Sequence, residues 1–316
     1  MRPKLLITGG CGFIGTHLAE RLSERYRLVL FDNLARDSLQ YVPALRAVPE
    51  VEVVSGDILD RDKVRAVVEG ATGVIHLAAI AGVSNYYERP VEVLRVNVQG
   101  TFGLLEAMVE AGVKRLIYFS SSEVYGPQAE NVVEADSMMV SGPVSEKRWV
   151  YAVSKLVSEH AVLRSGETYG LNCTCVRPFN VYGPRQTGEG AISNFARAMV
   201  RDEAIQIYGD GAEIRAWCYV TDMVDAVEGM LDNEASFGLS FNIGNPEARC
   251  STQELAEMLV RINGGGRIEK VSRAHSPIPI RYPDTGLAQD RLGFRSSVGL
   301  ERGLSETLAW FREIEQ

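Results

Sequence analysis

The sequence lacks the residue patterns that bind metals and nucleic acids. Its 4 histidines and 5 cysteines are scattered over 316 residues, no C-x-x-C occurs, and no histidine stands at metal-ligand spacing. We therefore expect no metal site and small, buried, reduced cysteines. Basic residues (33) are fewer than acidic ones (41), and no dense run of Lys/Arg is present. This charge balance disfavours nucleic acid as a partner.

Long hydrophobic runs are absent as well. The most apolar stretch, GVIHLAAIAGV at 73–83, is too short to span a bilayer, and MRPK leads into LLITGG without the cleavage pattern of a signal peptide. We expect no membrane partner and a cytoplasmic location. The chain is 46% hydrophobic and shows neither repeats nor a low-complexity linker. Its length allows one large or two interdependent globular domains.

Short β-rich runs alternate with helical periodicity through the first half of the chain. Parallel strands that are apolar on both faces must be covered by helices on both faces. The pattern therefore predicts a doubly wound α/β sheet of the Rossmann class. The expected strands are 4–9, 28–32, 51–57, 73–79, 115–121 and 172–179, and the expected helices are 14–25, 61–69, 91–111 and 150–166.

The alternation loosens after residue 180 into segments that contain Gly and Pro. We expect a dinucleotide-binding domain over 1–176, with a returning segment near 214–245, and a smaller mixed α/β substrate lobe over 177–316. Its expected helices are 190–201, 221–232, 251–262 and 301–314. Ligands of open α/β sheets bind at the carboxyl ends of the strands, so the cleft between the lobes is the expected site.

A glycine-rich turn, GGCGFIG, follows the first strand and opens a helix. Gly9, Gly12 and Gly15 allow a tight turn and bring backbone amides against a diphosphate at the helix N-terminus. Asp32 closes the second strand, where a carboxylate accepts hydrogen bonds from ribose hydroxyls and repels a 2′-phosphate. The pattern predicts a dinucleotide site that prefers NAD to NADP, with Asp57 facing the adenine; a ligand-free βα turn is the alternative.

A single Y-x-x-x-K, formed by Tyr151 and Lys155, lies on a predicted helix where positions i and i+4 share a face. A nearby ammonium favours the phenolate, so we expect Lys155 to lower the pKa of Tyr151 and make it a base for an alcohol. Ser121, at the end of the fifth strand, is the expected orienting hydroxyl. The alternative is a surface tyrosine beside a solvated lysine.

Together these motifs resemble the extended short-chain dehydrogenases/reductases that act on nucleotide sugars. The others that carry the resemblance are HLAA at 76–79, Asn97, RPFNVYGPRQ at 177–186 and YGDG followed by Arg215. The resemblance covers the chain from about residue 4 to its end. It implies NAD that stays bound while the sugar is oxidised at C4, modified and usually reduced again. It also implies a homodimer formed through the helices near 91–111 and 150–166.

The resemblance assigns residues to the cofactor and to the substrate. The cofactor set is Gly9, Gly12, Phe13, Ile14, Gly15, Asp32, Asn33, Asp57, Ile58, Leu77, Ala78, Ala79, Asn97, Ser120, Tyr151, Lys155 and Pro178. The substrate set is Asn180, Arg185, Tyr208, Arg215 and Arg281, with Arg281 assigned to the diphosphate.

The run Ser121, Ser122, Glu123 separates branches of this family. Members that are 4,6-dehydratases carry Thr-Asp-Glu, and simple 4-epimerases usually have no acid at the third place. The arrangement here resembles UDP-glucuronate decarboxylases, because loss of carbon dioxide needs no protonated leaving group. By the same resemblance Glu123 and Arg215 lie near the substrate carboxylate and C5. An ion pair of Arg215 with Asp210 or Glu213 is the alternative.

The resemblance leaves several reactions open. Our preferred hypothesis is decarboxylation of UDP-glucuronate; the alternatives are a nucleotide-sugar 4- or 5-epimerase, a 4,6- or 5,6-dehydratase, and a non-catalytic NAD-binding regulator. Two stretches depart from the decarboxylase pattern. GEG at 188–190 places an acid where that branch tends to carry a basic residue, which would disfavour an anionic sugar, and WCYV at 217–220 differs from the usual acidic-aromatic pair.

Overall fold

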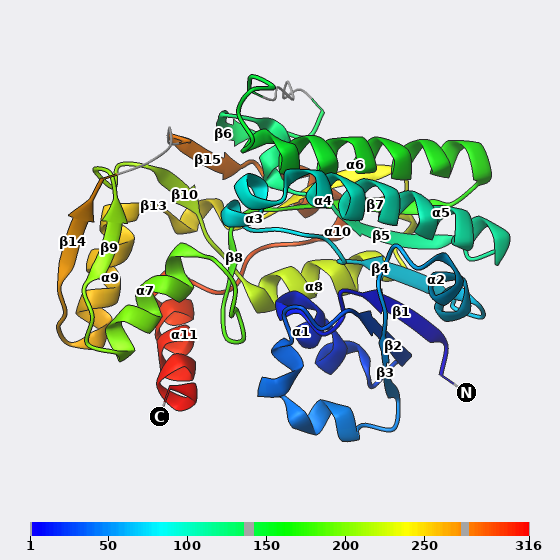
Figure 1. Cartoon of the computed structure of the whole chain (residues 1–316), viewed down its shortest axis with the longest axis horizontal. Helices are drawn as coiled ribbons and strands as arrows, with labels where there is room; N and C mark the ends of the chain where they lie inside the picture. The colour runs from blue at the N-terminus through cyan, green and yellow to red at the C-terminus, as the bar shows by residue number, and fades with distance from the viewer. Residues whose placement is uncertain (1, 136–141, 273–277, 316) are drawn as a thin grey trace.

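The computed structural model describes residues 2–135, 142–272 and 278–315, and its centre is a seven-stranded parallel sheet (Figure 1). The strand order is β12-β7-β5-β4-β1-β2-β3. Their bounds are β1 Lys4–Thr8, β2 Arg27–Asp32, β3 Val51–Ser55, β4 Gly73–His76, β5 Arg115–Phe119, β7 Asn172–Pro178 and β12 Leu239–Ile243. The order reverses between β1 and β4, the kind of position where open α/β sheets bind their ligands.

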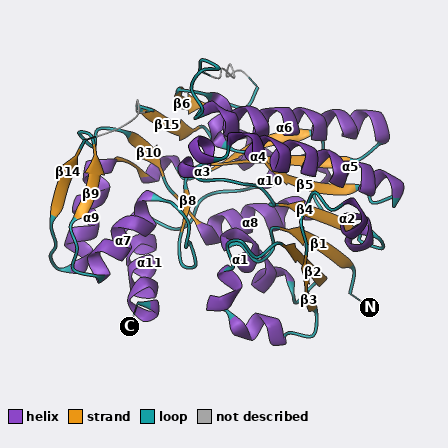
Figure 2. Cartoon of the chain, viewed as in Figure 1, coloured by secondary structure: helices purple, strands orange, loops and turns teal. Residues whose placement is uncertain are grey.

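Helices cover both faces of this sheet, because its strands send alternate apolar side chains to each side. Leu5 and Ile7 of β1 pack with α1 (Phe13–Leu22) and α8 (Val220–Leu231), whereas Leu6 packs with the helices of the other face. Those helices are α2 (Arg61–Val68), α5 (Gly100–Glu110) and α6 (Trp149–Tyr169) (Figure 2). The predicted doubly wound fold is confirmed.

Three short elements connect β4 to α5. They are α3 (Val83–Glu88), α4 (Pro90–Leu94) and a π-helical turn, η3 (Arg95–Gln99). Short 3-10 turns occur elsewhere, at η1 Ser38–Tyr41, η2 Pro43–Ala47, η4 Ser122–Tyr125, η5 Glu234–Ser236 and η6 Pro246–Ala248. Of these, η4 contains the acid of the serine run and follows directly on β5.

A smaller mixed lobe stands beside the carboxyl edge of the sheet. It holds a four-stranded sheet in the order β13-β10-β15-β6 and the pairs β11-β8 and β14-β9. The strands are β6 Gln128–Val132, β8 Val181–Tyr182, β9 Ile205–Tyr208, β10 Ile214–Ala216, β11 Cys218–Tyr219, β13 Arg249–Ser251, β14 Ile268–Val271 and β15 Ile280–Pro283. The later helices are α7 Ala191–Val200, α9 Thr252–Asn263, α10 Gly286–Leu292 and α11 Leu300–Ile314.

The chain crosses between the two sheets in both directions. β6, from the first half, pairs with β15 in the smaller sheet, and β12, from the second half, pairs with β7 in the large one. β12 falls in the segment that the sequence predicted to return near 214–245. The domain boundary at residue 176 stays a prediction.

Two further features concern the cysteines and the helices. All five cysteines are free; four of them are buried, as the sequence predicted, whereas Cys250 is only half-buried. In the part of the chain that the structure describes, no helix combines the length and the apolar character needed to cross a bilayer.

Candidate active site

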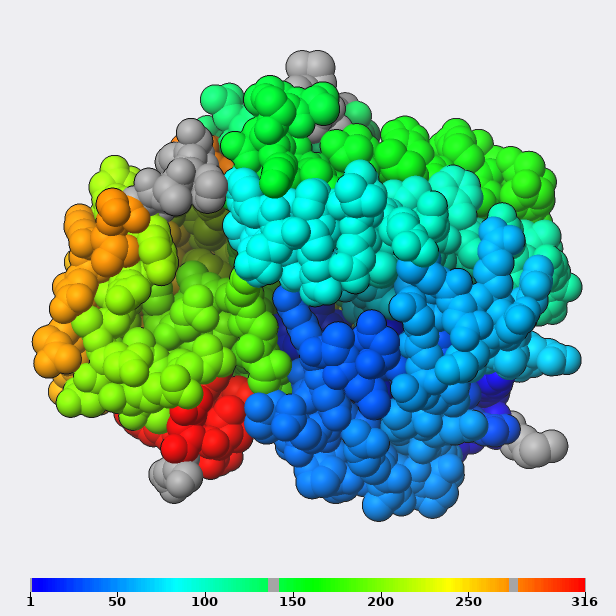
Figure 3. Space-filling view, in the orientation of Figure 1, coloured from blue at the N-terminus to red at the C-terminus, as the bar shows by residue number. Residues whose placement is uncertain are grey.

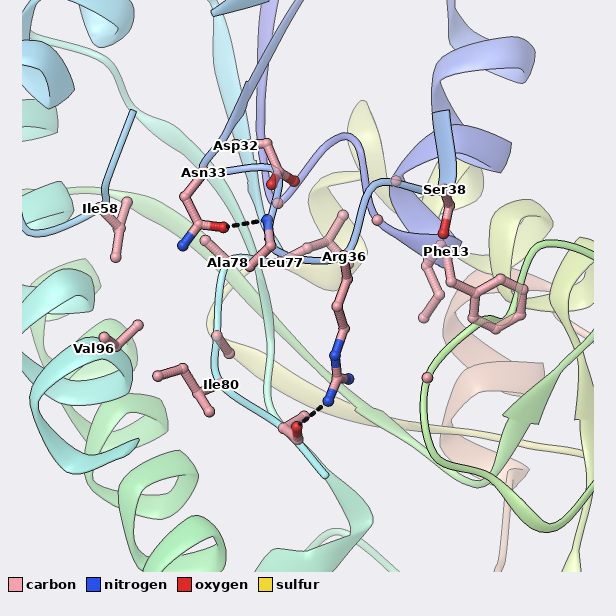
Figure 4. A pocket seen from close by; sticks show the side chains of 18 of the residues that line it. Phe13, Asp32, Asn33, Arg36, Ser38, Ile58, Leu77, Ala78, Ile80 and Val96 are labelled. Atoms are coloured by element: carbon pink, nitrogen blue, oxygen red, sulfur yellow. Dashed lines mark hydrogen bonds between the residues drawn. The ribbon is translucent and has the colours of Figure 1, made fainter. Parts of the chain in front are cut away.

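A cavity of about 390 Å³ opens at the carboxyl ends of β1, β2 and β4 (Figures 3 and 4). Twelve of the residues that the sequence assigned to the cofactor line it. They are Gly9, Gly12, Phe13, Ile14, Gly15, Asp32, Asn33, Asp57, Ile58, Leu77, Ala78 and Ala79. The glycine loop and the ends of three strands thus meet where the sequence predicted a dinucleotide.

The glycine loop has the shape that a dinucleotide requires. Gly9 has φ +70°, and a Cβ there would lie 2.7 Å from the backbone nitrogen of Ala78. A Cβ at Gly15 would lie 2.6 Å from the carbonyl oxygen of Gly10, so α1 packs closely against the turn. Backbone N–H groups at the start of α1 can therefore approach a diphosphate without side-chain obstruction. These residues fit NAD.

Asp32 links the end of β2 to the glycine loop. Its carboxylate accepts hydrogen bonds from the backbone N–H groups of Cys11 (3.0 Å) and Leu34 (2.8 Å). Burial raises the pKa of Asp32, and these two N–H donors act in the opposite direction. The carboxylate is thus held at the cavity wall, where the sequence predicted contact with the adenosine ribose.

Five residues of the predicted cofactor set do not line the cavity: Tyr151 and Lys155, which form the catalytic pair, and Asn97, Ser120 and Pro178. Asn97, in η3, bonds Ile80 through both of its amide atoms and donates to the Ser154 hydroxyl at 3.0 Å, which ties the β4–α3 segment to α6. Ser120 donates to Glu159 at 2.5 Å, and Pro178 ends β7. In this structure Asn97 and Ser120 support the walls of the site.

The predicted catalytic pair lies on the first turns of α6. Lys155 is 3% exposed, and its ammonium donates to the carbonyl oxygen of Phe119 at 2.7 Å. Its Nζ is 5.9 Å from the centre of the Tyr151 ring. The Ser121 hydroxyl accepts the Glu123 backbone N–H at 3.1 Å and also hydrogen-bonds the phenol of Tyr151. The serine run, Tyr151 and Lys155 therefore meet as predicted.

The pKa of Tyr151 differs from the expectation. Burial and the charge of Glu123 raise it, although the hydrogen bond with Ser121 lowers it. Burial also lowers the pKa of Lys155 to about 7. The prediction that the ammonium lowers the phenol's pKa is wrong for this structure, because Lys155 gives its hydrogen bond to Phe119 and desolvation outweighs its charge.

Glu123 lies among three guanidinium groups. It pairs with Arg281 on β15, 2.5 Å away, and with Arg148, 3.6 Å away, and the charge of Arg215 also acts on it. Burial raises the pKa of Glu123, but these cations more than offset that effect, so its pKa lies below the ordinary value. Glu123 is therefore ionised at neutral pH. Ser122 beside it is buried.

A second cavity, of about 350 Å³, adjoins the first. Asn180 and Arg215, both predicted to bind substrate, line it, and Gln186 and Glu189 line both cavities. Arg215 donates to the backbone carbonyls of Ile214 (2.8 Å) and Ile278 (2.9 Å). Burial lowers the pKa of Arg215 to about 10, and the neighbouring charge of Arg281 acts in the same direction.

Two predicted substrate residues lie elsewhere in this structure, and a third has a different partner. Arg185 pairs with Glu20 of α1 at 2.7 Å, and Tyr208 is 56% exposed at the end of β9. Neither lines a cavity of the site. Arg281, assigned to the diphosphate, bonds Glu123 and the carbonyl oxygen of Gly126.

Several residues of the site were not among those predicted from the sequence. The ring of Tyr86 stacks on that of Tyr151, with centroids 5.1 Å apart and planes 13° apart. Arg148 reaches Glu123 from the turn before α6, and Arg36 and Glu189 line the dinucleotide cavity from two different loops. Glu189 drew attention only as the acid of GEG at 188–190, and the position of Tyr86, shortly after the fourth strand, could have suggested a role.

Comparison with known proteins agrees with this geometry. A model of the NAD dependent epimerase/dehydratase family matches residues 5–244. The chain belongs to this family. Membership confirms the predicted class, the extended dehydrogenases/reductases that act on nucleotide sugars, and with it the NAD cofactor that fits the glycine loop.

The family's relatives span several reactions. The chain is 35% identical to UDP-N-acetyl-alpha-D-glucosaminuronate decarboxylase of Bacillus cytotoxicus, with 100% of this chain and 99% of that protein covered. It is 29% identical to UDP-glucuronic acid decarboxylase 1 of Xenopus tropicalis, over 99% of this chain and 73% of that protein. UDP-glucuronic acid 4-epimerase of Bacillus cereus, solved with UDP-glucuronic acid and NAD, matches with a TM-score of 0.90 and 26% identity, over 98% and 99% of the two chains.

Proposed function

We propose that this family member decarboxylates a UDP-linked hexuronate, such as UDP-glucuronate or its 2-acetamido counterpart. The observation that carries the proposal is the group of Arg148, Arg215 and Arg281 around Glu123. The charge of Glu213 also acts on Arg215, but the three guanidiniums still outnumber the two carboxylates, Glu123 and Glu213. A third carboxylate, that of the sugar, would complete the charge balance of this largely buried cluster.

Each neighbouring group has a definable part in such a reaction. Bound NAD would supply the hydride acceptor for oxidation at C4. The positive charge of bound NAD would favour the phenolate of Tyr151, which would then accept the proton of the C4 hydroxyl that Ser121 orients. Once C4 is a ketone, the bond between C5 and C6 breaks. C6 leaves as carbon dioxide, and the electron pair stays on the sugar as an enolate. A proton must then reach C5, and return of the hydride to C4 would restore both the C4 hydroxyl and the oxidised cofactor.

Arg215 is a better candidate than Glu123 for the group that donates the proton to C5. Glu123 is ionised and holds Arg281 and Arg148 in position. Arg215, whose pKa burial lowers to about 10, gives up a proton more readily than an ordinary guanidinium. We therefore assign proton delivery to Arg215 and the ordering of the cationic cluster to Glu123.

The acid at Glu189 is compatible with an anionic sugar. Its carboxylate accepts hydrogen bonds from the backbone N–H and the hydroxyl of Ser84, at the start of α3. Its charge is therefore engaged with hydrogen-bond donors at the junction of the two cavities, and Glu123 is the carboxylate paired with the arginines. The departure of this loop from the decarboxylase pattern thus removes no part of the proposed chemistry.

The first prediction concerns the reaction itself. Incubated with NAD and either UDP-hexuronate, the protein is expected to release carbon dioxide and form the UDP-sugar that lacks the carboxyl group, because the arginine cluster accepts a carboxylate. Mass spectrometry of the nucleotide sugars measures this. The UDP-hexoses without a carboxyl group serve as control and should not be converted. An isomer of unchanged mass would instead identify an epimerase, and loss of water a dehydratase.

We also propose that the protein is a homodimer. Exposed apolar side chains gather on α4, α5 and α6, which pack side by side in Figure 1. They are Val91, Leu94, Phe102, Val109, Val153 and Val157. These helices correspond to those expected from the sequence to pair in related enzymes, and a second copy would cover the face. The cytoplasmic location stays a prediction of the sequence.

The second prediction follows from this face. Phe102→Glu is expected to convert the dimer to a monomer, because two like charges would then be buried near each other in a symmetric interface. Light scattering coupled to size exclusion measures the mass. Val144→Glu, at a fully exposed apolar residue outside these helices, is the control and should remain dimeric. A wild-type monomer, or a dimeric Phe102→Glu variant, would contradict the proposed interface.

A further inference from the structure

Two side chains from distant loops fasten the segment between β4 and α3 over the dinucleotide cavity. Arg36, from the β2–η1 loop, crosses the cavity and donates to the carbonyl oxygen of Ala81 at 2.8 Å (Figure 4). Glu189, from the loop before α7, accepts the Ser84 backbone N–H at 3.3 Å and also the Ser84 hydroxyl. Arg36, Ala81 and Glu189 all line the cavity.

The two side chains converge on Gly82. This residue has φ +108°, and a Cβ there would lie 2.9 Å from Nη2 of Arg36 and 3.2 Å from Oε2 of Glu189. A Cβ at Gly188 would lie 3.1 Å from Nη1 of Arg36. Two glycines therefore make room for a cation and an anion that approach the same short segment from opposite loops.

The contacts of Arg36 and Glu189 are better placed to retain a dinucleotide than to stabilise the fold. Arg36 and Glu189 are both exposed, and exposed polar contacts of this kind contribute little to the free energy of unfolding. Both, however, stand at the cavity that contains the glycine loop. The guanidinium of Arg36 lines the same cavity as the backbone N–H groups that would bind a diphosphate.

We propose that Arg36 and Glu189 form a clasp, defined as their hydrogen bonds to Ala81 and Ser84, that closes the cavity and slows the release of NAD. Because both fasten the same short segment, 81–84, each contact positions the segment for the other, so the loss of either contact frees it. The inference needs the NAD cofactor and no particular sugar reaction. A failure of the decarboxylase proposal would therefore leave it unaffected.

The test measures the rate at which NAD leaves the protein when displaced by excess fluorescent etheno-NAD. Arg36→Ala and Glu189→Ala are each expected to raise this rate about tenfold, the size expected for loss of one charge-assisted hydrogen bond. The double variant should release NAD no more than about twice as fast as the faster single variant, since either loss already frees the segment. Glu189→Gln, which keeps one acceptor oxygen for Ser84, should release NAD at a rate between those of the wild type and of Glu189→Ala.

The controls separate the clasp from general damage. Arg61→Ala removes an exposed arginine that pairs with Glu106 away from the cavity, and it should leave NAD release unchanged. Thermal unfolding should be the same for all variants. An unchanged release rate in Arg36→Ala or Glu189→Ala, multiplied effects in the double variant, or a Glu189→Gln that behaves like Glu189→Ala would overturn the clasp.

Discussion

The substitution Tyr151→Phe is expected to lower kcat on a UDP-hexuronate by about 10³-fold, within the usual range for loss of a general base. The phenol of Tyr151 is the group hydrogen-bonded to Ser121, and its ring stacks on Tyr86. Phenylalanine keeps the ring and its stacking and removes only the proton acceptor. The measurement is steady-state turnover, together with the NAD content of the purified protein, which should be unchanged.

Tyr169→Phe is the matched control, because Tyr169 stands on the same helix with its ring 54% exposed, far along the helix from the serine run. It should turn over at the wild-type rate. If Tyr151→Phe were equally active, the proton of the C4 hydroxyl would have to leave by another route, and the role assigned to Tyr151 would be lost.

The substitution Glu123→Gln is expected to lower kcat by about a hundredfold, the size expected when catalytic groups are misplaced, while KM for the UDP-hexuronate stays the same or falls. The variant loses the anion that orders Arg281 and Arg148, so the cations no longer hold their positions during the reaction. Without the Glu123 anion, the net positive charge of the arginine cluster, which attracts the substrate carboxylate, nevertheless increases. The separate changes in kcat and KM, measured over a range of substrate concentrations, distinguish this role from simple binding.

Glu134→Gln offers a comparison in the same part of the chain. Glu134 is a partly buried carboxylate that accepts the Asn242 backbone N–H at 2.7 Å and is not paired with the three arginines. This variant should keep both kinetic constants. A Glu123→Gln variant with a raised KM and unchanged kcat would show that Glu123 only binds the substrate.

The parts of the site that could be predicted are those set by neighbours in the chain. Gly9, Gly12 and Gly15 lie within one βα turn, and Asp32 ends the adjacent strand, so their meeting follows from the parallel sheet alone. The spacing of Tyr151 and Lys155 is likewise a property of one helix. In such cases the local sequence pattern already determines where the residues lie in the folded protein.

Other parts could not be predicted, because they join residues distant in the sequence. Arg281 meets Glu123 across 158 positions, and Glu189 meets Ser84 across 105. The pKa of Tyr151 was predicted in the wrong direction since it depends on burial, which no spacing reveals. In the smaller lobe, strands such as β10 and β13 have three residues each, too few to show an alternation.

The crossing of β6 and β12 between the sheets restricts how molecules can enter and leave. Two lobes joined by one hinge can swing apart as rigid bodies. Here β6 from the first half of the chain belongs to the smaller sheet and β12 from the second half belongs to the large one, so several connecting segments run between the lobes and all of them would oppose a wide separation. Entry and exit are therefore left to short surface loops, whose movement breaks only a few side-chain contacts.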